Sequence, residues 1–453
     1  MKKAAFHNLG CKVNEYETEA MKQALSEQGY EIVPFEETAD VYVVNTCTVT
    51  QIADKKSRQM LHQARKRNPG AVVVAVGCYA QKEGSGLPED EAVDLILGNH
   101  DKLSLAPILE AYFGEKGTGK DHLTDIGSVR EYDATSLDHP VDRTRGFVKI
   151  QDGCNQFCSY CLIPYVRGRV RSRRMEDILK ELSTMGQSGV KEVTLSGIHM
   201  SSYGLDFANP GKNMRTPEAG ENFLNKDLLD LLLKADQVPG IQRIRLGSLE
   251  PGIMTEDFVK GIAAMNKLCP HFHLSLQSGS DTVLKRMNRR YTTEEFRRAV
   301  FLLRKYFDRP AITTDVIAGF PGETEEEAKE TEAFVREIGF AKMHIFKYSR
   351  REGTVAAGMR DQVTDQVKTR RSAALQTIDK QNHRTYAESL KDREIEVLFE
   401  EKEERDGRTF WKGHSRENLL CLLASEEDLE NTTVGTRLLS LLEDGAVLVE
   451  REI

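Results

Sequence analysis

The sequence has 453 residues, of which 39% are hydrophobic and 30% are charged, and its net charge is −8. A chain of this length is expected to form about two to four domains, and its negative charge argues against wholesale coating of nucleic acid. No apolar run approaches the roughly 20 residues that span a bilayer, and the first residues, MKKAAFHNLGCKVN, lack the apolar core of a secretory signal. We therefore expect a cytoplasmic protein with no membrane contact, whose eight cysteines serve as ligands, catalysts or core residues.

Residues 1–112 alternate short apolar runs with amphipathic segments. The runs KAAFHNL, DVYVVNT, AVVVAVG and VDLILG are typical of buried strands, and EYETEAMKQALSEQ and DKKSRQMLHQARKR are typical of the helices between them. Alternating strands and helices predict a doubly wound parallel sheet, the first part of an α/β fold. Residues 113–144 are polar and turn-rich, and they are predicted to be a linker.

Residues 145–385 resume the alternation of strands and helices. The candidate strands are FVKI, EVTLS, QRIRLG, FHLSLQ, TTDVIA and KMHIF. Six strand-helix units are fewer than the eight of a closed barrel, so the pattern predicts an open, partial (β/α)6 barrel. Basic residues between Arg143 and Arg174, in RTRGFVK and VRGRVRSRR, predict an anionic substrate near its first strand.

Residues 386–453 form a different, acidic region. From residue 391 onward it holds 9 Lys or Arg against 17 Asp or Glu, so the rest of the chain is neutral overall. Its short apolar runs, EIEVLF, RTFWKGH, NLLCLLA and GAVLVER, are separated by polar turns. This spacing predicts a small all-β module.

Three cysteines, Cys154, Cys158 and Cys161, follow directly after the first strand of the predicted barrel. Thiolates are preferred ligands of iron-sulfur clusters and of zinc, and both kinds of site normally take four protein ligands. Cys269 precedes a strand and would lie at the opposite end of the barrel, and Cys421 lies in an apolar run typical of a core. An iron with one open position is therefore favoured over a distant fourth ligand, and such a position is useful when a substrate or cofactor binds there.

A second triplet lies upstream, where Cys11, Cys47 and Cys78 each stand just beyond the end of a predicted strand. The carboxyl ends of parallel strands share one edge of a sheet, which is where ligand sites of open α/β sheets lie. The three thiols are therefore expected to converge on a second cluster with three protein ligands. The alternative is that they are merely buried core cysteines.

Taken together, these motifs resemble the methylthiotransferase family of radical S-adenosylmethionine enzymes. CNQFCSYC matches the CxxxCxxC signature of the superfamily, with Tyr160 before its last cysteine, and PYVRGRVRSR, QSGSDTVLKRMNRRYT and DVIAGFPGET add to the likeness. The resemblance covers nearly the whole chain. It implies an N-terminal cluster domain, a radical S-adenosylmethionine partial barrel, a C-terminal TRAM module and two 4Fe-4S clusters.

The resemblance also implies a reaction. S-adenosylmethionine would fill the open position of the barrel cluster and, on accepting one electron, would give a 5′-deoxyadenosyl radical that abstracts hydrogen from the substrate. A second S-adenosylmethionine would supply a methyl group, and the N-terminal cluster would present the inserted sulfur. The implied partners are tRNA, an electron donor such as a flavodoxin or ferredoxin, and a sulfur source.

The substrate expectation comes from a few residues of the first motif. NLGCKVNEYET, which contains Cys11, and RIRLGSLEP (243–251) are similar to the subgroup that acts on N6-threonylcarbamoyladenosine next to the tRNA anticodon. Alternatives within the family are isopentenyladenosine of tRNA and a ribosomal protein. Alternatives of another class are a non-catalytic iron-sulfur electron carrier and an RNA-binding protein with zinc-like cysteines.

Several other residues stand at the ends of barrel strands, where barrel enzymes place their chemistry. The candidate cofactor-binding residues are Tyr160, Gly197, Ser248, Glu250, Gln277 and Gly319. Turn formation or helix capping is the alternative for several of them. Three histidines, His199, His271 and His273, are expected to be structural.

Phosphate contacts to RNA are expected from the basic run of the barrel, namely Arg167, Arg169, Arg171, Arg173 and Arg174. The acidic C-terminal module would need a local basic face to touch RNA. The candidates for that face are Arg408, Lys412 and Arg416, beside Phe410 and Trp411.

Overall fold

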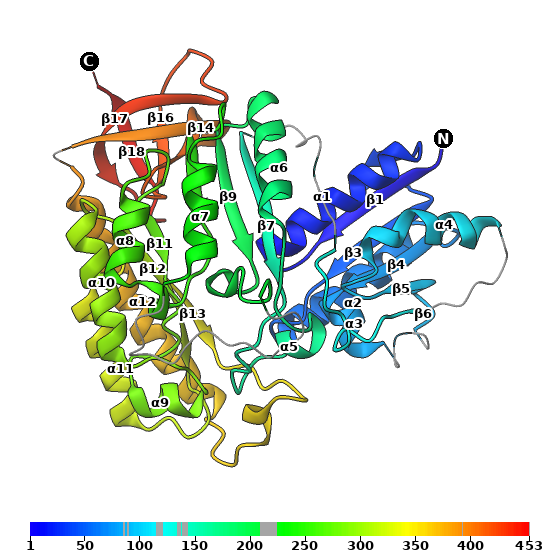
Figure 1. Ribbon diagram of the computed structural model, residues 1–453, viewed down its shortest axis with the longest axis horizontal. Coiled ribbons are helices and arrows are strands. Elements are labelled where there is room, and N and C mark those ends of the chain that lie inside the picture. The colour runs from blue at the N-terminus through cyan, green and yellow to red at the C-terminus, as the bar shows by residue number, and fades with distance from the viewer. Residues whose placement is uncertain are drawn as a thin grey trace.

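The computed structural model describes residues 1–84, 87, 90–114, 121–133, 137, 144–208, 224–391 and 393–452. Three parts follow one another along the chain, an N-terminal α/β unit, a central partial barrel and a small C-terminal barrel (Figure 1). The C-terminal barrel and the N-terminal unit lie on different sides of the central one. No helix in these described ranges is long and apolar enough to cross a membrane.

The N-terminal unit is a six-stranded parallel sheet in the order β2-β1-β3-β4-β5-β6. Its strands are β1 (Lys3–Asn8), β2 (Glu31–Val33), β3 (Val41–Thr46), β4 (Val72–Gly77), β5 (Leu95–Leu97) and β6 (Asp121–His122). Helices α1 (Lys12–Glu27) and α4 (Leu105–Gly114) pack on one face, and α2 (Gln51–Arg67) and α3 (Cys78–Glu83) pack on the other. β3 and β4 are buried throughout, which is why they are continuous apolar runs. The predicted doubly wound sheet is confirmed.

The expected linker, residues 113–144, is partly wrong. Asp121 and His122 form β6, the edge strand of the sheet, and pair with β5. Ile126 and Val129, which follow it, are buried. An edge strand of two polar residues has no apolar pattern, so nothing in the local sequence marks it as part of the sheet. The remaining residues of this range, 115–120, 134–136 and 138–143, lie outside the described part.

The central part contains the six parallel strands that were predicted. They are β7 (Arg145–Asp152), β9 (Glu192–Gly197), β10 (Arg243–Leu246), β11 (His271–His273), β12 (Ala311–Ala318) and β13 (Lys342–Lys347). They form two sheets, β10-β9-β7-β8 and β11-β12-β13, where β8 (Arg171–Ser172) is antiparallel to β7. Parallel bridges between Ile244 and Leu268 and between Leu249 and Leu274 join the two sheets into one curved wall.

Helices surround this wall on its outer side (Figure 1). They are α6 (Met175–Gln187), α7 (Lys226–Ala235), α8 (Glu256–Ala263), α10 (Thr293–Tyr306), α11 (Glu325–Ile338) and α12 (Asp365–Glu388). Two short helices, α5 (Ile163–Val166) and α9 (Asp281–Arg286), lie instead beyond the carboxyl ends of the strands. Capping boxes of Thr292 with Glu295 and of Thr324 with Glu327 fix the starts of α10 and α11. One continuous apolar core fills the space between strands and helices.

The C-terminal module is a closed barrel in the order β14-β15-β16-β18-β17. Its strands are β14 (Glu394–Arg405), β15 (Arg408–Ser415), β16 (Leu420–Leu423), β17 (Thr432–Leu441) and β18 (Val447–Arg451). The predicted all-β module is confirmed, with β17 as an additional strand. Cys421 is buried in its core, and so are Ala387 and Leu390 at the end of α12, so the module's core begins on the helix that precedes it.

Buried arginines attach this module to the amino ends of the central strands. Glu192, the first residue of β9, accepts hydrogen bonds from Arg145 Nε at 2.9 Å and Arg245 Nε at 3.0 Å. Arg243 Nε donates to Glu396 Oε1 of the module at 2.8 Å, and Arg245 Nη2 donates to the Ser415 carbonyl at 3.1 Å. The module therefore covers the end of the barrel opposite the carboxyl ends of its strands.

Candidate functional site

The N-terminal cysteines meet at the point where the strand order of the sheet reverses. Cys11 follows β1, Cys47 follows β3 and Cys78 follows β4, and these three strands are neighbours in the sheet. A Cβ atom added at Gly10 would lie 2.8 Å from Cys47 Sγ. Burial, together with the smaller effects of the charges of Cys78 and Cys11, raises the pKa of Cys47 to about 12. The three thiols are thus close together in the crevice where open α/β sheets bind ligands.

The second triplet lies on a loop at the carboxyl end of β7. The amide of Cys154 donates to the Gly168 carbonyl at 3.1 Å. Gly153 has a φ of 70°, and a Cβ atom there would overlap the Arg169 carbonyl oxygen, so the position requires glycine. The amide of Ser159 donates to the Met287 carbonyl at 3.0 Å. The segment after α9 therefore fixes the cysteine loop from its other side.

One arginine of that segment contacts the cysteines directly. Arg289 Nη1 donates to Cys158 Sγ at 3.1 Å, its Nε donates to the Tyr291 hydroxyl at 3.0 Å, and its Nη2 lies 2.9 Å from Glu250 Oε1. His199 Nε2 lies 3.3 Å from the other carboxylate oxygen of Glu250. Glu250 and Arg289 thus form a buried charged pair beside the thiols.

The donor set fits a metal cluster. Burial raises the pKa of Cys161 to about 12 and that of Cys154 well above its ordinary value, so without a metal these thiols stay protonated. A bound cation reverses this preference, because it stabilises the thiolate directly. Within the described ranges, no three His, Cys, Asp or Glu side chains converge as the ligands of one metal ion do.

The two triplets face each other across the junction between the first two parts. Arg167, just after α5, donates from Nε to Cys78 Sγ at 3.3 Å. Asn99 Nδ2 donates to the Val166 carbonyl at 2.7 Å and lies 3.6 Å from the same sulfur. The charge of Cys78 also contributes to the raised pKa of Cys161, after larger effects that begin with burial. Both sets of thiols therefore lie at this junction.

A buried network of charges holds this junction together. Glu17 of α1 accepts from Lys149 Nζ at 2.7 Å and from Arg167 Nη1 at 2.9 Å, and it also pairs with Lys102. Asp152 Oδ2 accepts from Lys149 Nζ at 2.6 Å and lies 3.1 Å from Arg167 Nη1. These cations hold the pKa of both carboxyls below its usual range although burial alone would raise it.

Comparisons with known proteins agree with this geometry. The profile described as "Uncharacterized protein family UPF0004" matches residues 3–98, and that of the radical SAM superfamily matches residues 148–335. A protein of Bacillus subtilis (strain 168) named threonylcarbamoyladenosine tRNA methylthiotransferase MtaB is 38% identical over 441 residues, covering 97% of this chain and 94% of its own length. This chain belongs to the methylthiotransferase family of radical S-adenosylmethionine enzymes.

Other relatives of this methylthiotransferase carry two kinds of name. A second MtaB, from Aquifex aeolicus (strain VF5), is 39% identical and covers 87% of this chain and 92% of its own length. A tRNA-2-methylthio-N(6)-dimethylallyladenosine synthase of Carboxydothermus hydrogenoformans is 35% identical, and the match covers 95% of this chain and 94% of its own length. Among solved structures, the radical S-adenosylmethionine methyltransferase TsrM from Kitasatospora setae has a TM-score of 0.57 at 15% identity, covering 78% of this chain and 77% of its own. That likeness concerns the fold alone.

Three of the five arginines expected to bind RNA are placed differently in the methylthiotransferase. Arg167, Arg171 and Arg173 are at most 3% exposed. Arg167 bonds the network described above, Arg171 Nη1 donates to the Arg167 carbonyl at 2.8 Å, and Arg173 pairs with Glu181. The expectation of phosphate contacts is therefore wrong for these three, since their guanidiniums already neutralise or cap groups inside the protein. Arg169 is half-buried over the Phe157 ring, and Arg174 is exposed.

Some of the candidate cofactor-binding residues lie close to the barrel cysteines, and others lie elsewhere on the rim. Glu250 lies beside the barrel cysteines, and Tyr160 packs edge-on against Phe320 at a ring distance of 6.4 Å. Gly197 faces Gln151, whose Oε1 accepts from the amide of His199 at 2.7 Å. The other three candidates, Ser248, Gln277 and Gly319, also follow barrel strands. Ser248 is exposed, Gln277 has a φ of 66°, and Gly319 makes room for the side chain of Lys368.

The basic face expected on the C-terminal module does not form as described. Trp411 is 3% exposed, Lys412 Nζ pairs with Glu401 at 2.5 Å, and Arg416 Nη2 donates to the Leu268 carbonyl at 2.9 Å. Two of its three cations are therefore used within the protein, because the module binds the barrel partly through Arg416. Arg408 remains exposed.

Sequence reasoning missed Asn14, Glu17 and Arg289. The first two lie in the same motif as Cys11, where Asn14 Oδ1 accepts from Arg167 Nη2 at 2.5 Å. Arg351 was also missed, and its Nη2 lies 3.0 Å from Asp54 Oδ2, which attaches the segment after β13 to the N-terminal unit. Asn14, Glu17 and Arg289 all lie in the motifs that carried the family resemblance. Polar and charged residues inside such motifs were therefore the signal that could have identified them.

Proposed function

We propose that this chain is a tRNA N6-threonylcarbamoyladenosine methylthiotransferase, which converts the modified adenosine next to the anticodon into its 2-methylthio derivative. The observation that carries the proposal is the 38% identity, over 97% of this chain, to a protein named for that substrate. The identity to a dimethylallyladenosine synthase is 35%, so isopentenyladenosine is the second candidate. A ribosomal protein is a third acceptor within the family.

Two 4Fe-4S clusters and S-adenosylmethionine are part of this proposal. Cys154, Cys158 and Cys161 would hold one cluster, and Cys11, Cys47 and Cys78 would hold the other. When bound, these groups supply the electron that cleaves S-adenosylmethionine and the sulfur that is inserted. The same proposal includes the assignment of the C-terminal barrel as a TRAM module. It also includes a flavodoxin or ferredoxin as electron donor and a separate sulfur source.

The chain's own residues would position these groups. Arg289 presents an N–H group to Cys158 and neutralises Glu250, so that the Glu250 carboxylate is held beside the cysteine triplet. Tyr160, Gly197 and Gln277 stand on the same rim and are the proposed contacts of the nucleoside and methionine parts of S-adenosylmethionine. The opposite end of the barrel is closed by the C-terminal module, which favours a site that excludes water from that side.

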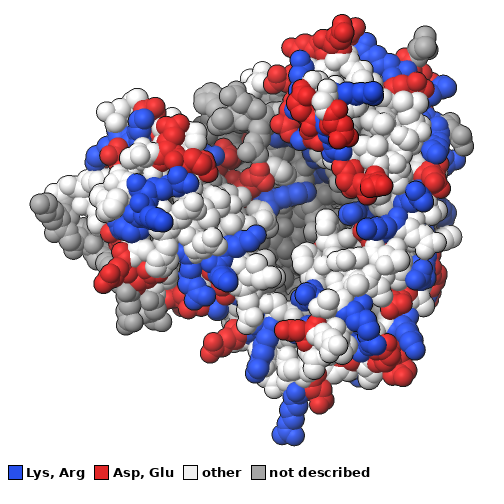
Figure 2. Space-filling model, turned by 180° about the vertical axis from the view of Figure 1, so that it is seen from behind, with Lys and Arg blue, Asp and Glu red and all other residues white. Residues whose placement is uncertain are grey.

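The surface of the molecule has a hollow with basic side chains at its border, where RNA could bind. Seen from behind, the molecule is hollowed between the N-terminal unit and the central barrel, and Lys and Arg side chains border the hollow (Figure 2). Arg169 and Arg174 are the two arginines of the basic run whose side chains reach the surface. We assign backbone phosphate contacts near the anticodon to these two.

Mass spectrometry of nucleosides from bulk tRNA tests the proposal. A strain lacking the gene should lose 2-methylthio-N6-threonylcarbamoyladenosine and accumulate its unthiolated precursor, and restoring the gene should reverse both changes. A gene with Cys11, Cys47 and Cys78 replaced by alanine should fail to restore it. Loss of the isopentenyladenosine derivative instead would transfer the assignment to the second candidate, and unchanged methylthio nucleosides would contradict a tRNA substrate.

A further inference from the structure

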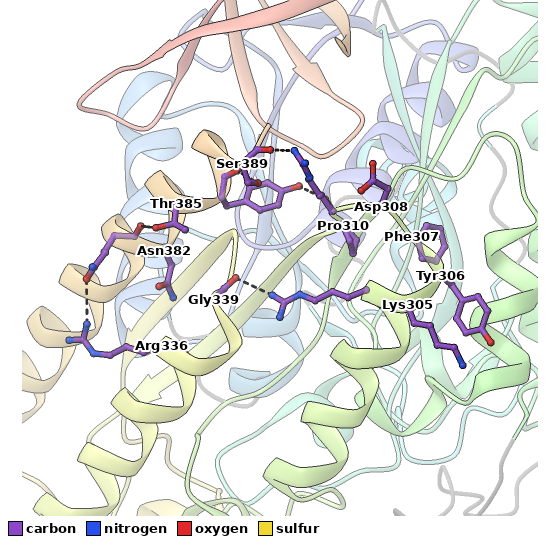
Figure 3. Close-up of a pocket in the computed structure, with 14 residues that line it drawn as sticks. Lys305, Tyr306, Phe307, Asp308, Pro310, Arg336, Gly339, Asn382, Thr385 and Ser389 are labelled. Atoms are coloured by element: carbon purple, nitrogen blue, oxygen red, sulfur yellow. Dashed lines mark hydrogen bonds between the residues drawn. The ribbon is translucent and has the colours of Figure 1, made fainter. Parts of the chain in front are cut away.

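A pocket of about 900 Å³ lies on the outside of the central barrel, and none of the residues that line it is a cysteine (Figure 3). It is bounded by the end of α10, the loop before β12, the end of α11 and the last turns of α12. Pro310 and Gly339, which line it, precede β12 and β13, so the pocket is at the amino ends of the strands. Its volume is in the range of small-molecule sites.

Three arginines of the pocket have only neutral partners. Arg304 Nη2 donates to a carbonyl at 2.5 Å, Arg336 Nη1 donates to a side-chain amide at 3.4 Å, and Arg309 donates to another carbonyl. The acceptors are Ile338, Gln381 and Ser389, respectively. Within the described ranges, no carboxylate comes within ion-pair distance of these three guanidiniums.

The remaining charges of the wall are already neutralised. Lys305 Nζ lies 2.9 Å from Glu256 Oε1, and Asp308, the one acidic residue among those that line the pocket, lies 2.8 Å from Arg393 Nη1. The pocket thus has a surplus of three positive charges. A concave surface with one sign of charge attracts the opposite charge, and a guanidinium matches phosphate geometry particularly well.

The uncharged polar groups of the wall are occupied by the protein itself. Thr385 donates to the Gln381 carbonyl at 3.0 Å, and Asn382 Nδ2 donates to the Val335 carbonyl at 2.9 Å. Few donors or acceptors remain that could read the edge of a base. Charge is therefore the main recognition feature, and it selects phosphate without selecting a nucleotide sequence.

We propose that this pocket binds phosphate groups, and that its ligand is the backbone of the RNA substrate. The assignment of RNA as the ligand rests on the proposed function. β12 has eight residues, so about 25 Å separates the pocket from the rim that carries the cysteines. A contact so far from the reacting nucleoside adds affinity and orients the RNA, while specificity stays at the rim.

The test compares a double variant, Arg304→Gln with Arg336→Gln, with the matched control Arg297→Gln. Arg297 is also on α10 and is half-buried, and Glu294 and Glu337 neutralise it. We expect the double variant to bind an unmodified tRNA transcript roughly tenfold more weakly, with a salt slope smaller by about two. The control should change affinity less than about twofold. If the double variant unfolds, Arg336→Glu alone replaces it, since that side chain is at the surface.

Calorimetry with pyrophosphate separates the two possible sources of phosphate. If the double variant binds both the transcript and pyrophosphate more weakly than the parent protein does, the RNA backbone is supported as the ligand. Weaker binding of pyrophosphate with unchanged transcript binding supports a phosphate pocket but overturns RNA as its ligand. No change in either overturns the pocket. These affinities are independent of nucleoside analysis, so a failure of the proposed reaction would be recognised separately.

Discussion

Arg167 of the central barrel donates a hydrogen bond from Nε to Cys78 Sγ of the N-terminal unit, over 3.3 Å. The same guanidinium bonds Glu17, Asp152 and Asn14 and is completely buried. The N-terminal triplet therefore depends on a residue that follows the barrel triplet in the chain. Removing this arginine affects both the junction and the thiols.

We expect Arg167→Gln to lower the free energy of unfolding by about 3–5 kcal/mol, because Glu17 and Asp152 lose a buried partner. It should also reduce iron bound by the N-terminal triplet, while the barrel triplet keeps its own. Thermal unfolding and iron analysis measure the two effects. Arg169→Gln is the stability control, since Arg169 is half-buried and forms no ion pair with a carboxylate of the described residues. A variant as stable as the parent would contradict the role of the network.

The two cysteine triplets should have separable functions. Replacing Cys154, Cys158 and Cys161 by alanine should abolish cleavage of S-adenosylmethionine. Replacing Cys11, Cys47 and Cys78 should preserve cleavage but prevent sulfur insertion, and bound iron should fall from about eight to about four atoms per chain. Anaerobic reconstitution followed by iron analysis and product chromatography checks this. Full methylthiolation by the second variant would refute two clusters.

Arg289→Gln should weaken the reaction by roughly ten- to a hundredfold, because second-shell partners of metal ligands commonly have effects of that size. The variant removes an N–H donor and a positive charge beside Cys158, so the reduction potential of the barrel cluster should fall. Potentiometric titration followed by electron paramagnetic resonance measures that potential. Arg297→Gln, far from the cysteines on α10, should leave it unchanged. An unaltered potential in the Arg289 variant would leave Arg289 a purely structural role.

The attachment of the C-terminal module to the barrel should weaken as the pH falls into the acid range. Burial alone would raise the pKa of Glu192, but Arg245, Arg145 and Arg243 hold it far below its usual range. The unfolded value is about 4.3, so the stabilisation is complete above that pH and is lost as the pH falls below it. Limited proteolysis and thermal unfolding between about pH 3 and pH 7 should show the decline.

The matched variant for that experiment is Glu192→Gln. It should be less stable than the parent at neutral pH, because three arginines lose their common carboxylate. Its stability should also depend less on acid pH. An identical decline in both proteins would assign the effect to other carboxyls.

The sequence by itself determined the alternation of strands and helices, the six strands of the barrel and the positions of both cysteine triplets after strands. These features depend on local periodicity and on the spacing of residues along one segment. The cysteines were found for the same reason, since a residue that follows a parallel strand must lie at the carboxyl edge of its sheet.

Only the tertiary structure decided what the charged residues do. Arg167, Arg171 and Arg173 belong to a basic run that suggested RNA, yet each is buried because a partner or acceptor from elsewhere in the fold surrounds it. Arg289 reaches Cys158 from 131 residues away, and Arg243 reaches Glu396 from 153. The charge of a side chain can be read from the sequence, but its burial and its partner depend on segments that only folding brings together.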